Sequence, residues 1–262
     1  MAIISTYCKK GGVGKTTLLG YLAHYYALKG KKVLVISADD QNSIFKLFGH
    51  GNFITDSTDN FLENYLTGTC EAADLTCEAR RNMYIIKTLN TDRLSFTLTI
   101  KRQEERKIID TIHEFSHYFD YIFIDFPPSS SRLSEILLDI SDKILLIIGL
   151  DTLGLDGYLN TIQYFIDTDI NLDKIKYIIP TGYHKVKLAP NKALKELKLQ
   201  ASQYTPGSLI TDPVSEKSIV KNLQTDGISV FDDAQMPSKF HQKNFIEFQK
   251  ELKKLFDSLD LG

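Results

Sequence analysis

The chain has 262 residues, of which 43% are hydrophobic, and a formal net charge of −2. This length suffices for one domain with a full hydrophobic core, which we expect to span residues 1–262. The nearly neutral charge excludes a chain that is basic throughout. Three cysteines without a Cys-x-x-Cys spacing indicate neither a disulfide framework nor a zinc site. With no apolar run of about 20 residues and no room for a cleavable signal before the first motif, we expect a cytoplasmic protein.

Strand and helix patterns alternate along the chain. Continuous apolar runs predict buried strands at 2–7, 33–36, 83–86, 121–124, 144–148 and 175–179. Helical spacing of apolar residues predicts helices at about 18–28, 59–67, 104–116, 131–140, 155–166, 190–201, 214–223 and 239–259. The stretches 68–80, 181–189 and 224–238 are predicted to be surface loops. This order is typical of an α/β fold: a doubly wound, mostly parallel sheet with helices on both faces.

A glycine-rich loop lies between the first predicted strand and the first predicted helix. Residues 9–17 are Lys-Lys-Gly-Gly-Val-Gly-Lys-Thr-Thr. Glycines let the backbone curl around a polyphosphate, whose charge the helix N-terminus attracts. Lys15 can reach the terminal phosphates, and Thr16 has the hydroxyl that ligates Mg²⁺ in such loops. We therefore expect a nucleotide to be bound by this set of residues: Gly11, Gly12, Val13, Gly14, Lys15, Thr16 and Thr17.

Two lysines distinguish this loop from the general phosphate-binding pattern. Lys9 stands where that pattern has glycine, and Lys10 directly precedes the glycine pair. The loop resembles the signature of the deviant Walker A ATPases of the ParA/MinD family, and most closely the ParA-type partition proteins. The resemblance implies the P-loop NTPase fold, and Mg²⁺-dependent hydrolysis of ATP to ADP and phosphate. It also implies that Lys10, as a catalytic residue beside Lys15, crosses a dimer interface to the partner's phosphates.

Asp125 closes the predicted strand 121–124 and precedes Phe126-Pro127-Pro128. Parallel sheets present such carboxylates at the ends of their strands, where a nucleotide site needs them. The segment 119–128 resembles the family's Walker B region, which implies that Asp125 holds Mg²⁺ together with Thr16. The alternative is that Asp125 caps the following helix.

A second acidic segment, Ser37-Ala38-Asp39-Asp40-Gln41, ends the predicted strand 33–36. It resembles the family's Asp-x-Asp-Pro-Gln segment, which implies that Asp39 lies near the attacking water as a catalytic residue. Ser37 replaces the first aspartate of that pattern and Asp40 replaces the proline, so hydrolysis could be slow or altered. A solvated turn is the alternative for Asp39 and Asp40.

Recognition of adenine rests on the resemblance. The family often places an asparagine just after the strand that corresponds to 175–179, where this chain has Pro180-Thr181-Gly182-Tyr183. The segment 210–213 resembles the second base-contacting loop. Thr181 and Pro213 are therefore the candidate base contacts, and ordinary turn residues are the alternative.

The resemblance also implies partners. ATP would close a sandwich homodimer that binds nonspecific DNA and so associates with the nucleoid. A centromere-binding adaptor protein would stimulate hydrolysis and thereby drive partition of a plasmid or chromosome. Residues 173–262 hold 14 lysines against 11 acidic residues, so phosphate contacts are expected in this part of the chain. The candidate DNA contacts are Lys185, Lys187, Lys192, Lys195, Lys198, Lys217 and Lys221; a merely solvated lysine face is the alternative.

Two other functions remain open at this point. One is a MinD-like ATPase that cycles on a membrane, since MinD relatives carry an amphipathic C-terminal helix. The acidic residues within 245–260 dilute the basic face of that helix, so we expect it to pack on the sheet and not to bind a membrane. The other is a slowly hydrolysing, nucleotide-dependent switch that regulates transcription or DNA transfer.

Overall fold

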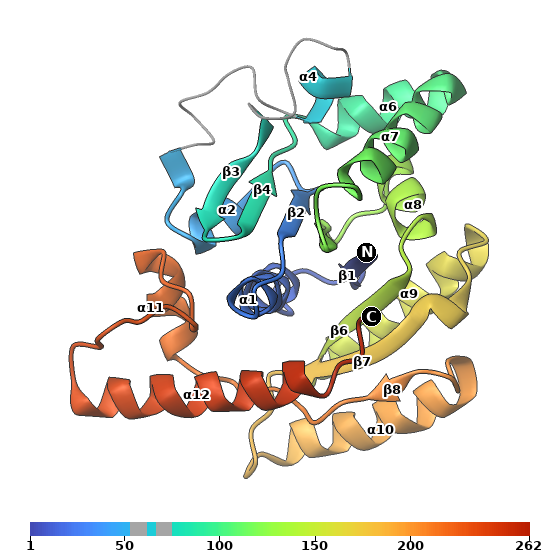
Figure 1. Cartoon of the computed structure of the whole chain (residues 1–262). Coiled ribbons are helices and arrows are strands. Elements are labelled where there is room, and N and C mark those ends of the chain that lie inside the picture. The colour runs from blue at the N-terminus through green and yellow to red at the C-terminus, as the bar shows by residue number, and fades with distance from the viewer. Residues whose placement is uncertain (53–61, 67–74) are drawn as a thin grey trace.

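A single eight-stranded sheet organises the molecule (Figure 1). The computed structural model describes residues 1–52, 62–66 and 75–262. The strand order is β3-β4-β2-β5-β1-β6-β7-β8, and every neighbouring pair is parallel except β3 with β4. The strands are β1 (Ala2–Tyr7), β2 (Val33–Ser37), β3 (Cys77–Arg80), β4 (Met83–Ile86), β5 (Tyr121–Asp125), β6 (Lys143–Gly149), β7 (Ile175–Thr181) and β8 (Leu209–Ile210). The predicted doubly wound fold is confirmed.

Helices cover both faces of this sheet. One face carries α1 (Lys15–Leu28), α2 (Ser43–Leu47), α11 (Ile219–Asp226) and α12 (Lys239–Asp257), which pack on one another. The other carries α6 (Thr91–Ile100), α7 (Arg102–Phe115), α8 (Arg132–Asp139), α9 (Thr152–Asp167) and α10 (Leu188–Tyr204), with α4 (Leu62–Leu66) against α7. A short 3₁₀ turn, Leu172–Lys174, leads into β7. The two termini lie close together near the middle of the view in Figure 1. Gly262 is so near Ala2 that a Cβ added to it would contact the Ala2 side chain.

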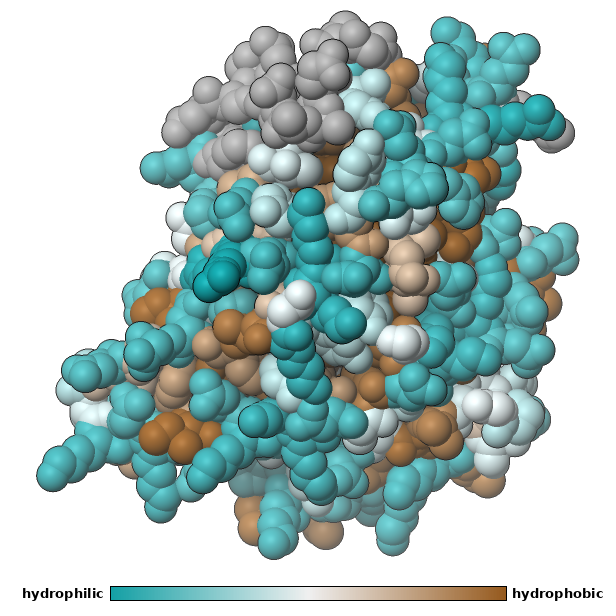
Figure 2. Space-filling view, viewed as in Figure 1, coloured by the Kyte–Doolittle hydropathy of each residue, from teal (hydrophilic) through white to brown (hydrophobic). Residues whose placement is uncertain are grey.

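The central strands are apolar along their whole length because both of their faces are covered. All six residues of β1, and all five of β2 and of β5, are buried. Parallel strands between two helical layers show this pattern, whereas half-exposed strands alternate. On the face drawn in Figure 2, the outer side chains are mostly hydrophilic and the hydrophobic ones form small, separate groups.

Several predicted boundaries are wrong. Residues 77–80 form a strand rather than a loop, with an alternating burial pattern that suits an edge strand but is too short to predict. Helix α6 was not expected; its Asn90 cap accepts a hydrogen bond from the backbone N–H of Arg93. Helix α11 begins at Ile219, five residues later than predicted. Helices 104–116, 131–140, 155–166, 190–201 and 239–259 are found within a few residues. Of the predictions at 59–67 and 68–80, residues 59–61 and 67–74 lie outside the described residues.

The amphipathic C-terminal helix α12 turns its apolar stripe inward. Its buried residues are Phe245, Phe248, Leu252, Leu255 and Phe256, and it packs against α1 and α11. We expected this helix to pack on the sheet; its apolar stripe is buried as expected, but its main contacts are with helices α1 and α11. Within the described ranges, each helix is too short or too polar to cross a bilayer.

Candidate functional site

The candidate site lies where β1, β2 and β5 end side by side. The residue Thr6 of β1 and the residue Ser37 of β2 both pair in register with Asp125 of β5. The loop 8–14 leaves β1 at this edge and leads into α1. Gly12 and Gly14 have φ values of 75° and 95°, a left-handed conformation that a side chain would strain. The predicted loop therefore has the backbone that its glycines suggest.

Lys15 is buried beneath the loop, with 6% of its surface exposed. Its Nζ donates hydrogen bonds to the carbonyl oxygens of Cys8, at 3.2 Å, and Lys10, at 2.9 Å. Burial lowers the pKa of its ammonium, while the nearby Cys8, Asp125 and Asp39 oppose that shift. The cation is thus held at the loop by neutral carbonyl groups, where an anion would be a stronger partner.

Asp125 and Thr16 lie together next to Lys15. The Thr16 hydroxyl donates to Asp125 Oδ1 at 3.1 Å. Asp125 is completely buried, and its Oδ2 has no hydrogen-bond partner among the described residues. Burial, helped by the nearby Asp39, raises the pKa of this carboxyl to about 7, against the opposing effects of Thr16 and Lys15. A buried, unsatisfied carboxylate oxygen beside a hydroxyl fits a hard cation such as Mg²⁺.

A buried side chain shapes the loop that follows β2. Asn42 has a left-handed backbone (φ 46°) and is 1% exposed. Its amide donates to the carbonyls of Asp40 and Thr88, at 3.0 and 2.9 Å, and accepts from the Thr88 N–H at 3.2 Å. Within this loop Asp39 Oδ1 accepts from the Gln41 N–H, and Asp39 is near enough to Lys15 and Asp125 to influence their pKa values. The loop therefore brings Asp39 to the predicted metal site.

The buried Ser37 occupies the place of the family's first aspartate. Its hydroxyl donates to the Asp39 carbonyl at 3.0 Å, within the turn. Its Cα pairs with that of the buried Asp125. A carboxylate at position 37 would lie beside a carboxylate that burial already disfavours.

Lys10 is held within its own chain. Its Nζ forms an ion pair with Asp151 Oδ1 at 2.6 Å, and the two side chains are 20% and 62% exposed. The same carboxylate oxygen caps helix α9 by accepting from the Gly154 N–H. An added Cβ on Gly157 would lie 3.0 Å from Cβ of Lys10, so α9 packs closely against the loop. Lys10 therefore lies at the rim of the site, with an exposed partner.

The two candidate base contacts lie on neighbouring segments but differ in what their side chains do. The Thr181 hydroxyl is buried and donates to the Val13 carbonyl at 2.9 Å. Pro213 is half-exposed in the segment beside it, where the Val214 N–H donates to the Pro180 carbonyl. Thr181 thus holds the phosphate loop from below, a contact between residues 168 positions apart that the sequence does not signal.

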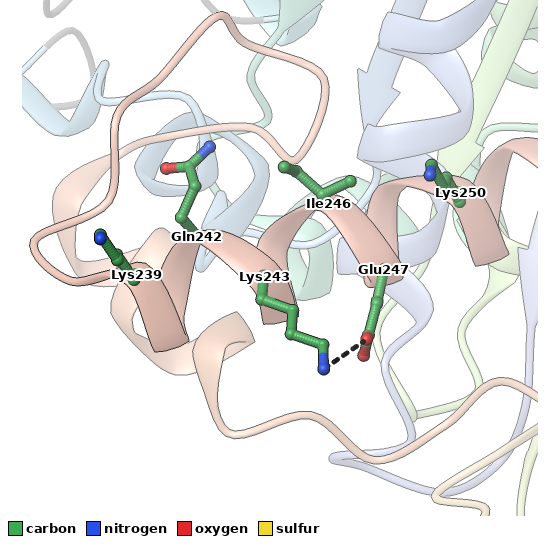
Figure 3. A pocket seen from close by; sticks show the side chains of 6 residues that line it. All are labelled: Lys239, Gln242, Lys243, Ile246, Glu247 and Lys250. Carbon is green, nitrogen blue, oxygen red and sulfur yellow. Dashed lines mark ion pairs between the residues drawn. The ribbon is translucent and has the colours of Figure 1, made fainter.

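A side chain that the sequence patterns missed also contacts the loop. Gln224 of α11 donates through Nε2 to the Thr17 hydroxyl at 2.6 Å. A pocket of about 280 Å³ opens at this point, lined by Thr16, Thr17, Ser43, Lys46, Leu47 and Gln224. A second hollow, of about 450 Å³, lies on the outer face of α12, apart from the first pocket. Lys239, Lys243 and Lys250 lie around Ile246 there (Figure 3). There, Lys243 pairs with Glu247 at 3.9 Å.

A family model described as an AAA domain matches residues 1–175, two thirds of the chain. A curated relative, an uncharacterized ATP-binding protein of Methanocaldococcus jannaschii, is 30% identical over 147 residues. That match covers 56% of this chain and 52% of the relative, so the chain spans about half the length of the first curated relatives it matches.

Solved structures extend the likeness to the whole fold. A variant of McdA from Cyanothece, in complex with ATP, has a TM-score of 0.77 and 19% identity; the match covers 100% of this chain and 98% of that one. A putative plasmid partition protein of Borrelia burgdorferi bound to AMPPNP has a TM-score of 0.70 and 19% identity, with 97% and 99% covered. A cobyrinic acid a,c-diamide synthase of Mycobacterium smegmatis, with an ATP analogue and magnesium, has a TM-score of 0.69, 18% identity and 100% and 98% coverage. These neighbours show the fold that this chain shares with them, and each of the three was solved with ATP or an ATP analogue.

Proposed function

Since this chain belongs to the ParA/MinD family of P-loop ATP-binding proteins, we propose that it is a magnesium-dependent ATPase of the ParA type. In this proposal ATP closes a homodimer that binds nonspecific DNA, and hydrolysis of ATP releases the DNA. A centromere-bound adaptor stimulates hydrolysis, and the cycle partitions a plasmid or chromosome within the cytoplasm. The partition protein among the structural neighbours supports the choice of this branch.

Each residue at the loop has a role that its contacts support. Lys15 exchanges its two carbonyl partners for phosphate oxygens, which are stronger acceptors. Gly11 to Gly14 present backbone N–H groups to the phosphates, and Thr17 continues them into the first turn of α1. Thr16 and Asp125 hold Mg²⁺, which when bound would neutralise phosphate charge. The unpartnered Oδ2 of Asp125 is the observation that carries this assignment.

Asp39 is the residue proposed to position the attacking water. It stands in the loop after β2, at the same sheet edge as Asp125, and its carboxylate is within electrostatic reach of Lys15. A carboxylate there can orient a water molecule and accept its proton. The network around Asn42 holds the loop in place without using the Asp39 carboxylate in any contact beyond the Gln41 N–H.

The Lys10–Asp151 ion pair suggests that the partner of Lys10 changes when the protein dimerises. To reach the partner's phosphates, Lys10 must leave Asp151, which is exposed and therefore loses little when it is solvated. Phosphate carries more charge than one carboxylate, so the exchange favours the ATP-bound dimer. Asp151 thus competes with the partner's nucleotide for the same ammonium.

The lysines of α10 and of the segment just before it form the basic surface best suited to DNA. Lys185, Lys192, Lys195 and Lys198 are exposed and make no ion pair within the described part of the chain. Lys187, in the same stretch, forms an ion pair in which its Nζ lies 3.7 Å from Glu216 Oε2. Lys217, which precedes α11, and Lys243 of α12 share Glu247, and Lys221 of α11 is an isolated exposed lysine without an ion pair among the described residues. We therefore propose α10 as the DNA-contacting helix, since counterion release requires lysines whose charge is not already neutralised.

Substitution of the α10 lysines tests whether this helix contacts DNA. Alanine at Lys192, Lys195 and Lys198 together is expected to weaken binding to arbitrary duplex DNA and to lower its salt slope by about 3. The matched control replaces Lys239, Lys243 and Lys250 on α12, which removes the same charge and is expected to change binding less. Equal losses in both variants would contradict the assignment of α10.

Multiple-turnover release of phosphate tests the enzymatic proposal. The expected result is release that requires Mg²⁺ and rises when DNA and the adaptor are present. No turnover under any of these conditions would contradict the ATPase and favour the regulatory switch. ATP-dependent sedimentation with anionic vesicles but not with DNA would favour a MinD-like cycle, although the apolar stripe of α12 is already buried.

A further inference from the structure

Gln224 brings the C-terminal third of the chain to the phosphate loop. Its Nε2 lies 2.6 Å from the hydroxyl oxygen of Thr17, a residue 207 positions earlier. Thr17 is in the first turn of α1, directly after Lys15 and Thr16. Both partners are half-buried at the 280 Å³ pocket. This bond therefore lies within one helical turn of the residues proposed to hold phosphate and metal.

The backbone that carries Gln224 is fixed from both sides. Ile219 and Leu223 are buried, and α11 packs on α2 and α12. After its last turn, Gly227 adopts φ 64°, where an added Cβ would lie 2.4 Å from Cα of Gly49. Arg80 donates to the Gly227 carbonyl and pairs with Asp232 at 2.7 Å. The helix that presents the amide of Gln224 is thus anchored by buried and hydrogen-bonded contacts on both sides.

The direction of the hydrogen bond matters for what Thr17 can do. A hydroxyl has one proton and two lone pairs, so an amide that donates to the oxygen leaves the proton free. The Thr17 O–H can then point away from Gln224, toward the N-terminal end of α1, where anions are favoured. A carboxylate at position 224 would instead accept that proton and repel a nearby phosphate.

We propose that Gln224 is a positioning residue that orients the Thr17 hydroxyl as a donor to the bound nucleotide's phosphates. The inference rests on the proposed function, because the anion is taken to be nucleotide phosphate. Gln224 contacts no reacting atom; it acts through Thr17. Helix α11 thereby becomes part of the nucleotide site, although it lies outside the part of the chain matched by the family model.

Nucleotide affinity with the full-length protein tests the proposal, using titration calorimetry with Mg-ATP and Mg-ADP. Gln224→Met removes the donor at similar size, and we expect the Kd of Mg-ATP to rise about fivefold. Gln224→Glu replaces the donor by an acceptor and adds a negative charge, so we expect the Kd of Mg-ATP to rise at least about tenfold. The matched control is Asn222→Asp, which adds the same charge on the exposed side of the same helix and is expected to bind as wild type does.

A double-mutant cycle separates positioning from a merely structural role. In a Thr17→Val background, Gln224→Met is expected to change the Kd by less than about twofold, because the coupled partner is gone. Wild-type affinity in both Gln224 variants, or an undiminished effect of Gln224→Met in that background, would overturn the proposal. If wild type binds ATP but hydrolyses none, the proposed function fails while this inference still stands; if wild type binds no nucleotide, both fail.

Discussion

Two loops at the same sheet edge hold their shape by different means. The phosphate loop after β1 bends at Gly12 and Gly14, which have positive φ values. The glycine pattern of the sequence predicts this bend. The loop after β2 bends at Asn42, whose buried amide is bonded to backbone groups on both sides. The first loop depends on residues that lack a side chain, and the second on one side chain that is fully used. We therefore expect substitutions in the first loop to damage nucleotide binding and substitutions in the second to damage turnover.

The largest effect should come from the phosphate loop. Lys15→Ala removes the buried cation, so we expect at least about 100-fold weaker binding of Mg-ATP, since charge-assisted hydrogen bonds of about 3 kcal/mol are lost. Calorimetric titration measures this. Lys9→Ala, whose ammonium lies over the Tyr164 ring rather than under the loop, is the control expected to bind normally. Unchanged affinity in Lys15→Ala would refute the phosphate assignment.

Asp39→Ala should distinguish most clearly between the role of the β2 loop in turnover and the role of the phosphate loop in ATP binding. We expect turnover to fall about 100-fold, because a residue that takes up the water's proton is lost, while ATP remains bound. The ATP-bound dimer should then accumulate, which gel filtration with Mg-ATP detects. Asp40→Ala, the next residue along, is the comparison variant and should retain most of the activity. Wild-type turnover in Asp39→Ala would show that the water is positioned elsewhere.

Asn42→Ala tests whether the β2 loop depends on its buried amide. Three hydrogen bonds to backbone groups are lost, so we expect about 1–3 kcal/mol less stability and about tenfold slower turnover. ATP affinity should change far less than turnover. Asn82, which also has a left-handed backbone (φ 64°) but lies in the β3–β4 turn, supplies the control. Asn82→Ala should cost stability without slowing turnover, and equal turnover in both variants would contradict the role of Asn42.

The smallest effect is expected at the rim. Asp151→Asn keeps an oxygen to cap α9 but removes the charge that holds Lys10. Because exposed ion pairs contribute about 0–1 kcal/mol, ATP-dependent dimers should form at a two- to fivefold lower protein concentration. Asp156→Asn, on the same helix, should leave dimerisation unchanged, and Lys10→Ala should abolish it. Weaker dimerisation of Asp151→Asn would show that Asp151 supports the interface instead of competing with it.

Local sequence patterns predicted the fold and the elements around the phosphate loop. Buried parallel strands are continuous apolar runs, and glycines mark a bend that few other residues adopt, so both signals lie in adjacent residues. Edge strand β3 and helix α6 escaped prediction because short or polar elements lack such a signal.

Contacts made through folding could not be predicted. Thr181 was singled out only as a candidate base contact, so its hydroxyl bond to the Val13 carbonyl was not foreseen; Gln224 was not singled out, yet it bonds Thr17. Each contact joins residues more than 160 positions apart, and only the folded chain brings them together. The pairing of Lys10 with Asp151 is likewise invisible to any pattern in the loop itself.

The central claim is that ATP converts this protein into a DNA-binding dimer. The most direct measurement is binding of the purified protein to arbitrary duplex DNA with Mg-ATP, with Mg-ADP and without nucleotide, at two salt concentrations. The account predicts binding with ATP alone, and weaker binding at the higher salt concentration because phosphate contacts carry it. Equal binding in all three nucleotide states, or none with ATP, would contradict the account.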